Sequence, residues 1–441
     1  MLAGNDAAGF HRIAVGLAET IVAEGWGTWE LRPDGQAPAG IMAAVYVYLP
    51  HEPWAVLPIY AGLFASSAAV LFAILRLAGF SSRAAGVGVT PLLLLPSAAL
   101  LFAIPHKDAF SLCGNLLFLY SLMRLIALPL TAPRRELWGG LAGSLMLGLT
   151  GVLLVWLVRP YEVEIMRGGG IVVAVVVTIA LVARMIRREI VPSQCMARLF
   201  AIWLLLLLVG NPFIQKVGWL DMFSAMEPVG KTEPVAEPVT EPVTEPVAEL
   251  VAKTGSAVED EEARTSPWFF AIIKEKVSRL AEIRKGYLAY HATAASAVDV
   301  SVNFDNMEEM VVYLPRALQI GLFAPFPKDW IGEGSLAVNT FMRRLVAVEM
   351  VLWYGACLFW VLALMRGPNL MVGWLLAAYA LFSLLIFVYA IPNMGTLYRM
   401  RFGFWIMLFA IGTAMAATLF EKQHVRKGGA AGPALGESCA A

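Results

Sequence analysis

Long apolar runs constrain this chain more than any other feature of its sequence. A helix needs about 20 mostly apolar residues to cross a bilayer. About nine runs reach this length, over residues 54–79, 85–105, 108–130, 137–158, 169–187, 199–216, 343–365, 370–391 and 402–420. Apolar residues make up 59% of 441 and the mean hydropathy is +0.70, well above the values of soluble domains. The sequence therefore predicts an all-α polytopic membrane protein with about nine transmembrane helices.

Composition divides the chain into two transmembrane parts and four others. These are an outer segment (1–50), six spans (51–216), a linker (217–267), an outer region (268–342), three spans (343–420) and a tail (421–441). Residues 10–24 have apolar positions at helical spacing, typical of an amphipathic helix on the membrane surface. The linker repeats Glu-Pro-Val, and its regular prolines exclude a helix. The outer region contains an amphipathic helix at 268–291 and an apolar stretch with prolines at 310–326, which favours a re-entrant or interfacial piece.

Lysine and arginine are concentrated in one set of loops, which the positive-inside rule places in the cytoplasm. If nine spans alternate, the C-terminal tail is cytoplasmic, while the N-terminus and residues 217–342 lie outside. We expect a multi-pass protein of the bacterial inner membrane. Residues 1–40 contain no apolar core of a signal peptide, so an exported N-terminus predicts a further span upstream of this chain. The alternative is an error of one in the number of spans.

Charge balance argues against a nucleic-acid partner, and cysteine spacing argues against a cysteine metal site and a disulfide framework. The chain has 33 Lys and Arg against 33 Asp and Glu, so nothing indicates a nucleic-acid partner. The cysteines are scattered without the spacing of a metal site, and a disulfide framework is not expected. They are Cys113, Cys195, Cys357 and Cys439.

Arg399 and Arg401 lie between two apolar runs, on the side of the membrane where arginine is disfavoured. An arginine pair at a bilayer boundary, held against that bias, indicates an anionic partner, most simply a phosphate. Residues i and i+2 point about 200° apart on a helix but share a face in an extended segment. We therefore expect both arginines to lie on an irregular or extended segment, which Pro392 and Gly395 favour.

Other charged residues gather where apolar runs end on the same side. Asp108 and Arg159 each end or begin such a run, and Arg159 is a second candidate for binding phosphate. Further candidates are Lys107, Arg167 and Arg316. For any one of these cations the alternative is that it snorkels to lipid headgroups. Together they predict a wet, charged cavity at the outer leaflet.

Asp6 is the main candidate for a catalytic carboxylate, with Asp108 as the second. It precedes the helix expected at 10–24, close to where an upstream span would end. A carboxylate there could act as a general base on an acceptor hydroxyl, or bind a divalent metal. The alternatives are a helix N-cap and a solvated terminus. No residue pattern requires a metal or another cofactor.

The layout resembles the GT-C superfamily of integral-membrane glycosyltransferases. The resemblance rests on an acidic residue in the first outer loop, an amphipathic outer helix, many spans and a later outer domain. Residues 313–327 and 393–401 are also similar to segments in polytopic proteins of bacterial polysaccharide gene clusters. The resemblance implies a GT-C-like bundle, a polyprenyl-phosphate-linked sugar donor at the outer face, and Asp6 as the catalytic carboxylate. The chain departs from that pattern because it lacks the first span and a second acidic pair.

Three functions follow as hypotheses. The first is a membrane glycosyltransferase or polymerase in cell-envelope polysaccharide assembly, working with membrane lipid, polyprenyl-phosphate sugar and other assembly proteins. The second is a transporter or flippase of a lipid-linked or anionic solute, with discontinuous spans near Pro91 and Pro96, at Gly210 to Pro212 and near Pro315 and Pro325 along a substrate path. The third is a non-catalytic scaffold that holds partners through residues 217–310.

Overall fold

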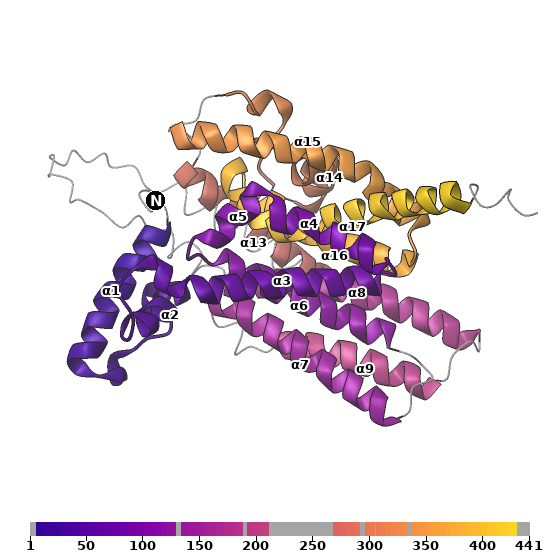
Figure 1. Ribbon diagram of the computed structural model, residues 1–441, viewed down its shortest axis with the longest axis horizontal. Helices are drawn as coiled ribbons and strands as arrows, with labels where there is room; N and C mark the ends of the chain where they lie inside the picture. The colour runs from indigo at the N-terminus through magenta and orange to yellow at the C-terminus, as the bar shows by residue number, and fades with distance from the viewer. Residues whose placement is uncertain are drawn as a thin grey trace, which may run out of the picture.

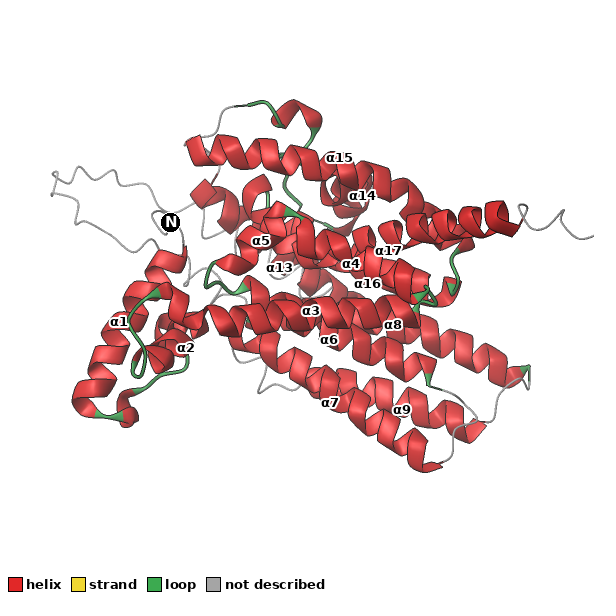
Figure 2. Ribbon diagram, viewed as in Figure 1, coloured by secondary structure: helices red, strands yellow, loops and turns green. Residues whose placement is uncertain are grey.

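In the computed structural model of the protein, the described residues are 6–128, 134–187, 192–210, 268–291, 296–304, 306–332 and 337–429. Within these ranges the chain forms helices and no strand, with one isolated antiparallel bridge between Ala297 and Asn393 (Figure 2). The expected all-α class is therefore confirmed for the described part of the chain. The predicted linker at 217–267 lies outside it.

Seven helices in the described ranges are long and apolar enough to cross a membrane. They are α3 (Leu57–Leu77, preceded by η3, Pro53–Val56), α6 (Asp108–Ala127), α7 (Arg134–Val158), α8 (Pro160–Ile186), α15 (Ala337–Arg366), α16 (Leu370–Ala390) and α17 (Met394–Gly429). Large apolar side chains on their outer faces are exposed, among them Leu153, Ile179 and Leu358. Lipid is the solvent in which such surfaces are stable, so a multi-pass membrane protein is supported.

The span expected at 85–105 is instead two short helices, α4 (Ser82–Leu94) and α5 (Pro96–Ala103). The break falls at Leu95, whose φ of −66° and ψ of 128° are extended. Proline disfavours the helical conformation in the residue before it, which explains why Leu95 is extended and α4 ends at Leu94. The span expected at 199–216 is described only through α9 (Pro192–Val209) and Gly210.

Several helices begin earlier than the apolar runs predict, most of all α8 and α17. Helix α8 begins at Pro160, so its first turns carry polar residues that the run at 169–187 leaves out. Helix α17 begins at Met394, and Arg399 and Arg401 therefore lie on a regular helix. The expectation of an irregular or extended segment at this arginine pair is wrong. A hydropathy count detects only the apolar part of a helix, whereas hydrogen bonding continues through its polar first turns.

The long helices lie roughly along one direction in two groups (Figure 1). One group contains α6, α7, α8 and α9, and the other contains α4, α15 and α17. Helices α3 and α16 contact both groups and join them. A lobe formed by α1 (Asp6–Glu24) and α2 (Ala37–Tyr46) lies beyond one end of the bundle.

The apolar face of α1 packs against α2 rather than against a membrane surface. Phe10, Ala14, Ala18 and Ile21 are buried at helical spacing, and α1 contacts α2. The sequence correctly predicts an amphipathic helix here. It does not reveal which apolar partner covers the helix, because a second helix and a bilayer select the same periodicity.

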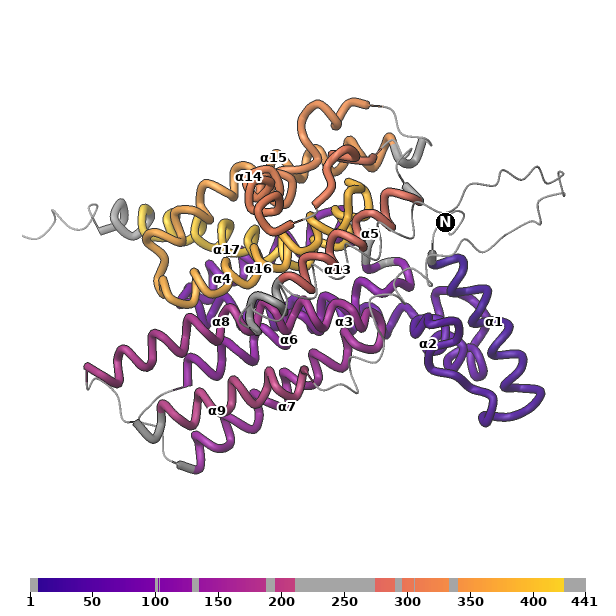
Figure 3. The backbone as a smooth tube through the Cα atoms, turned by 180° about the vertical axis from the view of Figure 1, so that it is seen from behind, coloured from indigo at the N-terminus to yellow at the C-terminus, as the bar shows by residue number. Residues whose placement is uncertain are grey.

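The region at 268–342 supplies two helices that pack on α16 (Figure 3). They are α13 (Trp268–His291) and α14 (Met307–Phe323). The proline-containing stretch expected to be re-entrant or interfacial is mostly α14, whose 17 residues are too few for a typical span. Between them, residues 296–304 dock on the turn before α17, where the Met394 amide donates to the Ser296 carbonyl at 2.8 Å.

The backbones of α6 and α7 touch at a pair of glycines. A Cβ added to Gly114 would lie 2.5 Å from the carbonyl oxygen of Gly151, and a Cβ added to Gly151 would lie 2.5 Å from that of Gly114. Small residues allow such close helix contact in membranes, where packing rather than water exclusion drives association.

We expect Gly151→Ala to destabilise the protein by about 1–3 kcal/mol, because the added methyl group separates α6 from α7. Gly139→Ala is the matched control on the same helix, since nothing lies within 4 Å of a Cβ at that position. The control should be neutral or slightly stabilising, given the higher helix propensity of alanine. Thermal unfolding of the purified variants in detergent measures the difference. Equal melting temperatures would contradict the contact.

Candidate functional site

The N-terminal ends of three helices lie together at the end of the bundle that carries the α1–α2 lobe. The loop before α6 contributes His106 to the same place. Asp108 begins α6, Pro160 begins α8, and Arg399 lies in the second turn of α17. Proline suits the first position of α8, and an acidic residue in the first turn of α6 complements the helix dipole. The lobe reaches this point, because the Phe10 ring lies 5.6 Å from the His106 ring.

The Asp108 carboxylate is the centre of a buried charged cluster, which we define as His106, Asp108, Arg159, Glu162 and Arg399. One oxygen of Asp108 accepts a close hydrogen bond from Arg159 Nη2. The other oxygen lies 2.9 Å from His106 Nδ1 and 3.7 Å from Arg399 Nε. Two guanidinium groups and an imidazole therefore surround one carboxylate.

Burial differs sharply between the two arginines of this cluster. The side chain of Arg159 is 3% exposed, whereas that of Arg399 is 30% exposed. Burial alone would lower the pKa of Arg159, but the negative charge of Asp108 outweighs it and the pKa is raised, so the group stays charged. Arg159 is thus enclosed, and Arg399 is the cation that an incoming molecule can reach.

A second carboxylate extends the cluster into the bundle. Glu162 accepts hydrogen bonds from Ser111 Oγ at 2.7 Å and Asn115 Nδ2 at 2.8 Å, and it lies 3.5 Å from Arg159 Nη1. The hydroxyl of Tyr379 on α16 donates to Asn115 Oδ1 at 3.2 Å. A polar chain therefore runs from Asp108 about two turns along α6.

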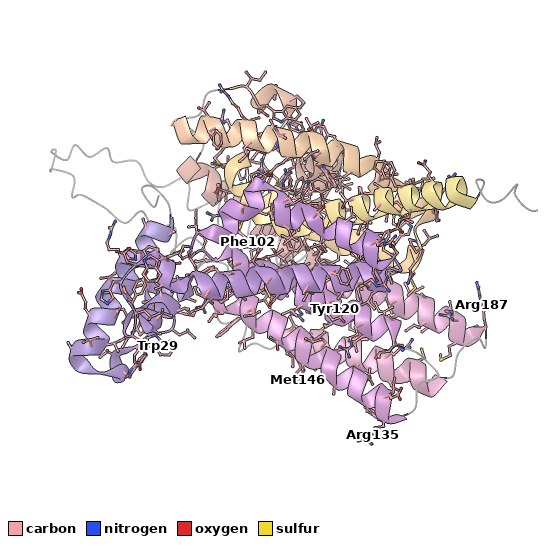
Figure 4. All side chains as sticks on the ribbon, in the orientation of Figure 1. Trp29, Phe102, Tyr120, Arg135, Met146 and Arg187 are labelled. Atoms are coloured by element: carbon pink, nitrogen blue, oxygen red, sulfur yellow. The ribbon has the colours of Figure 1, made fainter. Side chains whose placement is uncertain are left out.

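A small cavity lies against this cluster. The space open to water-sized molecules is about 20 Å³, enough for about one water. Its wall combines the charged groups with apolar side chains of α5, α6 and α17. The lining residues include Phe102, Asp108, Asn115, Glu162, Arg399 and Phe404. Phe102 is labelled in Figure 4, on the segment that leads to His106. The cavity is too small for a sugar, so a larger ligand would bind at its rim.

Arg401 has a different environment from Arg399. It is 1% exposed, and its guanidinium donates to the carbonyl oxygens of Ile320 and Gly321, each at 2.7 Å, and to that of Ala324. These carbonyls belong to the C-terminal turn of α14, where a helix leaves acceptors unsatisfied. Arg401 does not line the cavity. The expected pairing of the two arginines around one ligand is therefore not what the structure presents.

The other predicted residues are distributed as follows. Lys107 Nζ lies over the Phe10 ring at 5.7 Å, next to the cluster. Arg167 lies 4.0 Å from Glu164, two turns along α8. Asp6 begins α1, and its side chain lies outside the described part of the chain. The structure thus brings together Asp108, Arg159 and Arg399, with Lys107 adjacent.

Arg316 binds Asp299, within the region at 268–342. Its Nε and Nη2 donate to the two oxygens of Asp299 at 2.9 and 3.1 Å, and Tyr313 also donates to Asp299 at 2.7 Å. Burial alone would raise the pKa of Asp299, but these hydrogen bonds lower it below its ordinary value. Arg316 therefore fixes the loop 296–304 rather than lining the cavity.

Sequence reasoning did not assign roles to several buried polar residues. Asn115 follows Asp108 by seven residues, which places both on one face of α6. Glu349 is the single acidic residue of the run at 343–365, and it accepts hydrogen bonds from the Ser97 amide and the Tyr398 hydroxyl, each at 2.7 Å. A polar residue inside an apolar run was the available signal in both cases.

The described residues contain no group of three or more His, Cys, Asp and Glu side chains placed to hold a metal ion. No protein-family model matches the chain, and neither the curated proteins nor the solved structures give a match.

Arg401→Ala should destabilise the protein strongly, by about 2–5 kcal/mol, because the buried carbonyl oxygens of Gly321 and Ala324 lose the guanidinium donor, while that of Ile320 keeps only the Ala324 amide. Arg399→Ala, two residues away, should cost less than about 1 kcal/mol, since its side chain is partly exposed. Thermal unfolding in detergent compares the two variants. Equal losses of stability would contradict the division between a structural and an accessible arginine.

Proposed function

We propose that this protein is a membrane glycosyltransferase or polymerase that acts on polyprenyl-phosphate-linked sugars at the outer face of the membrane, in assembly of cell-envelope polysaccharide. One observation carries the proposal. The accessible Arg399 lies at the rim of a cavity beside the buried carboxylate of Asp108, and the other oxygen of Asp108 is paired with the buried Arg159.

A phosphate is the ligand that this arrangement favours. The planar guanidinium binds phosphate oxygens in a bidentate manner, and it is weakly hydrated enough to do so at a membrane boundary. The N-terminal ends of α6, α8 and α17 add the positive ends of three helix dipoles. The two arginines of the cluster match its two carboxylates in number, so these dipoles favour an anion at the rim.

The proposed reaction is a displacement at the anomeric carbon of the donor. The acceptor hydroxyl oxygen forms a bond to that carbon, the bond from the carbon to the phosphate oxygen breaks, and its electron pair leaves with the lipid phosphate. Arg399 stabilises the charge that develops on this phosphate. A carboxylate takes the proton from the acceptor hydroxyl.

Asp6 and Asp108 have different parts in this proposal. Both oxygens of Asp108 are engaged by cationic or hydrogen-bonding neighbours, so we assign Asp108 to holding Arg159 and Arg399 in position. Asp6 is the remaining candidate for the general base, and α1, which it begins, contacts the cluster through Phe10. No step is assigned to a metal ion.

A transporter or flippase of an anionic solute is the second candidate, and the break between α4 and α5 favours it. Glu349 occupies the N-terminus of α5 inside the bundle by accepting from the Ser97 amide. In many transporters a discontinuous helix of this kind presents its N-terminus to an anionic substrate. A transporter would bind polyprenyl phosphate or its sugar conjugate without cleaving it.

Arg399→Gln should lower glycosyl transfer by about 10²-fold or more, because the leaving phosphate loses its positive partner. Arg399→Lys keeps the charge without the guanidinium fork and should lose part of the rate. Arg366→Gln is the control, because Arg366 is an exposed arginine at the C-terminal end of α15, outside the cluster. This variant should keep full activity.

The measurement is polysaccharide output in cells at equal protein level, together with release of polyprenyl phosphate from lipid-linked sugar by the purified protein in detergent. Release of polyprenyl phosphate is a chemical step, so a transferase can carry it out in detergent without a second compartment. Binding of the lipid-linked sugar without this release supports the transporter. Full output and release by Arg399→Gln would overturn the role of Arg399.

The sidedness of the proposal can be tested separately. Reporter fusions at Gly255 and Gly428 should report opposite compartments, the first periplasmic and the second cytoplasmic, as the loop charges predict. An alkaline phosphatase and a green fluorescent protein fusion at each position give complementary signals. If both positions report the same compartment, the outer location of the 217–342 region cannot be combined with a cytoplasmic tail.

A further inference from the structure

The end of the bundle opposite the candidate site is strongly basic. Arg124 and Arg184 lie in the last turns of α6 and α8, Arg187 follows α8, and Arg198 lies in the second turn of α9. Figure 4 labels Arg135 and Arg187 at this end, far from the α1–α2 lobe. Glu162 and Arg184 are 22 positions apart on α8, so about 33 Å separate the two ends at 1.5 Å per residue. This is close to the thickness of a hydrocarbon core, about 30 Å.

Arg198 differs from the other buried arginines in the described part of the chain. Those others are Arg159, Arg284 and Arg401. Arg159 pairs with carboxylates, while Arg284 and Arg401 donate to backbone carbonyl oxygens. Arg198 is 4% exposed, and its Nε and Nη2 are buried with no hydrogen-bond acceptor.

A like charge makes the position of Arg198 less favourable still. Helix α8 packs against α9, and Arg184 lies close enough for its positive charge to act on Arg198. A buried guanidinium without an acceptor and beside a like charge is costly. An anion placed between the ends of α8 and α9 would remove both costs at once, because two guanidinium groups can share the oxygens of one phosphate.

We propose that Arg184 and Arg198 form a binding site for the phosphodiester headgroup of an anionic phospholipid. The occupant is a lipid because the site lies at the membrane boundary, beside an apolar surface suited to acyl chains. Met196, Phe200, Trp203 and Leu207 are exposed on α9 at helical spacing and form one continuous apolar face. The concentration of arginine at this end also matches the negative surface of a cytoplasmic leaflet. This site does not depend on the function proposed for the other end.

Native mass spectrometry and thermal unfolding of the purified full-length protein test the site. Phosphatidylglycerol, phosphatidylcholine and inorganic phosphate are added in separate titrations. The variants are Arg198→Gln and Arg184→Gln. Arg187→Gln is the control, because it removes the same charge from the same end at an exposed position. We expect the wild type and the control to retain phosphatidylglycerol and to be stabilised by it. Each of the two variants should bind it about tenfold more weakly, as expected for the loss of a charge-assisted hydrogen bond.

Three results would overturn the proposal. The first is equal phosphatidylglycerol affinity in Arg198→Gln and in the control. The second is equal stabilisation by phosphatidylcholine, and the third is a full effect of inorganic phosphate alone. If Arg198→Gln fails to accumulate, Arg184→Gln decides, because its side chain is exposed and its loss should not prevent folding.

Discussion

The ion pair between Asp108 and Arg159 is the interaction on which the candidate site depends. Each group is nearly enclosed at the end of a transmembrane helix, and neither would be stable there without the other. Their pairing fixes the start of α6 against the start of α8. It also leaves one oxygen of Asp108 directed at His106 and Arg399, and so determines where the accessible cation of α17 lies.

Helix geometry explains why two neighbouring arginines have separate tasks. On α17, Arg399 and Arg401 point about 200° apart, so one faces the cavity while the other faces α14. Arg401 donates to carbonyl oxygens in the C-terminal turn of α14, which attaches α14 to the same helical turn that carries Arg399. A ligand that displaces Arg399 therefore acts on a helix turn that is fixed on its opposite side.

The sequence allows the fold class and part of the site to be predicted. Asp108, Arg159 and Arg399 could be predicted to lie together because each is at the end of an apolar run, and the structure places all three at one end of the bundle. The extended segment expected at Arg399 and Arg401 was wrong because α17 extends beyond the apolar run, which a hydropathy count cannot detect. Glu162 and Glu349 were not given roles because their partners lie on other helices, and no periodicity within one helix reveals a contact with another.

The break at Leu95 connects the remaining buried carboxylate to the site. A helix that begins inside a membrane protein exposes amide groups that must find acceptors. Glu349 satisfies one of them at Ser97, and its second oxygen accepts from Tyr398, the residue before Arg399. Helix α5 then leads to His106 and Asp108. Through Glu349, the start of α5 is therefore bonded to the turn of α17 that carries Arg399. The chain that follows α5 carries Asp108, the carboxylate that Arg399 approaches. A single continuous span over 85–105 would have no free amide at Ser97 for Glu349 to accept from, so the interruption at Leu95 creates the contact that ties α5 to the turn that carries Arg399.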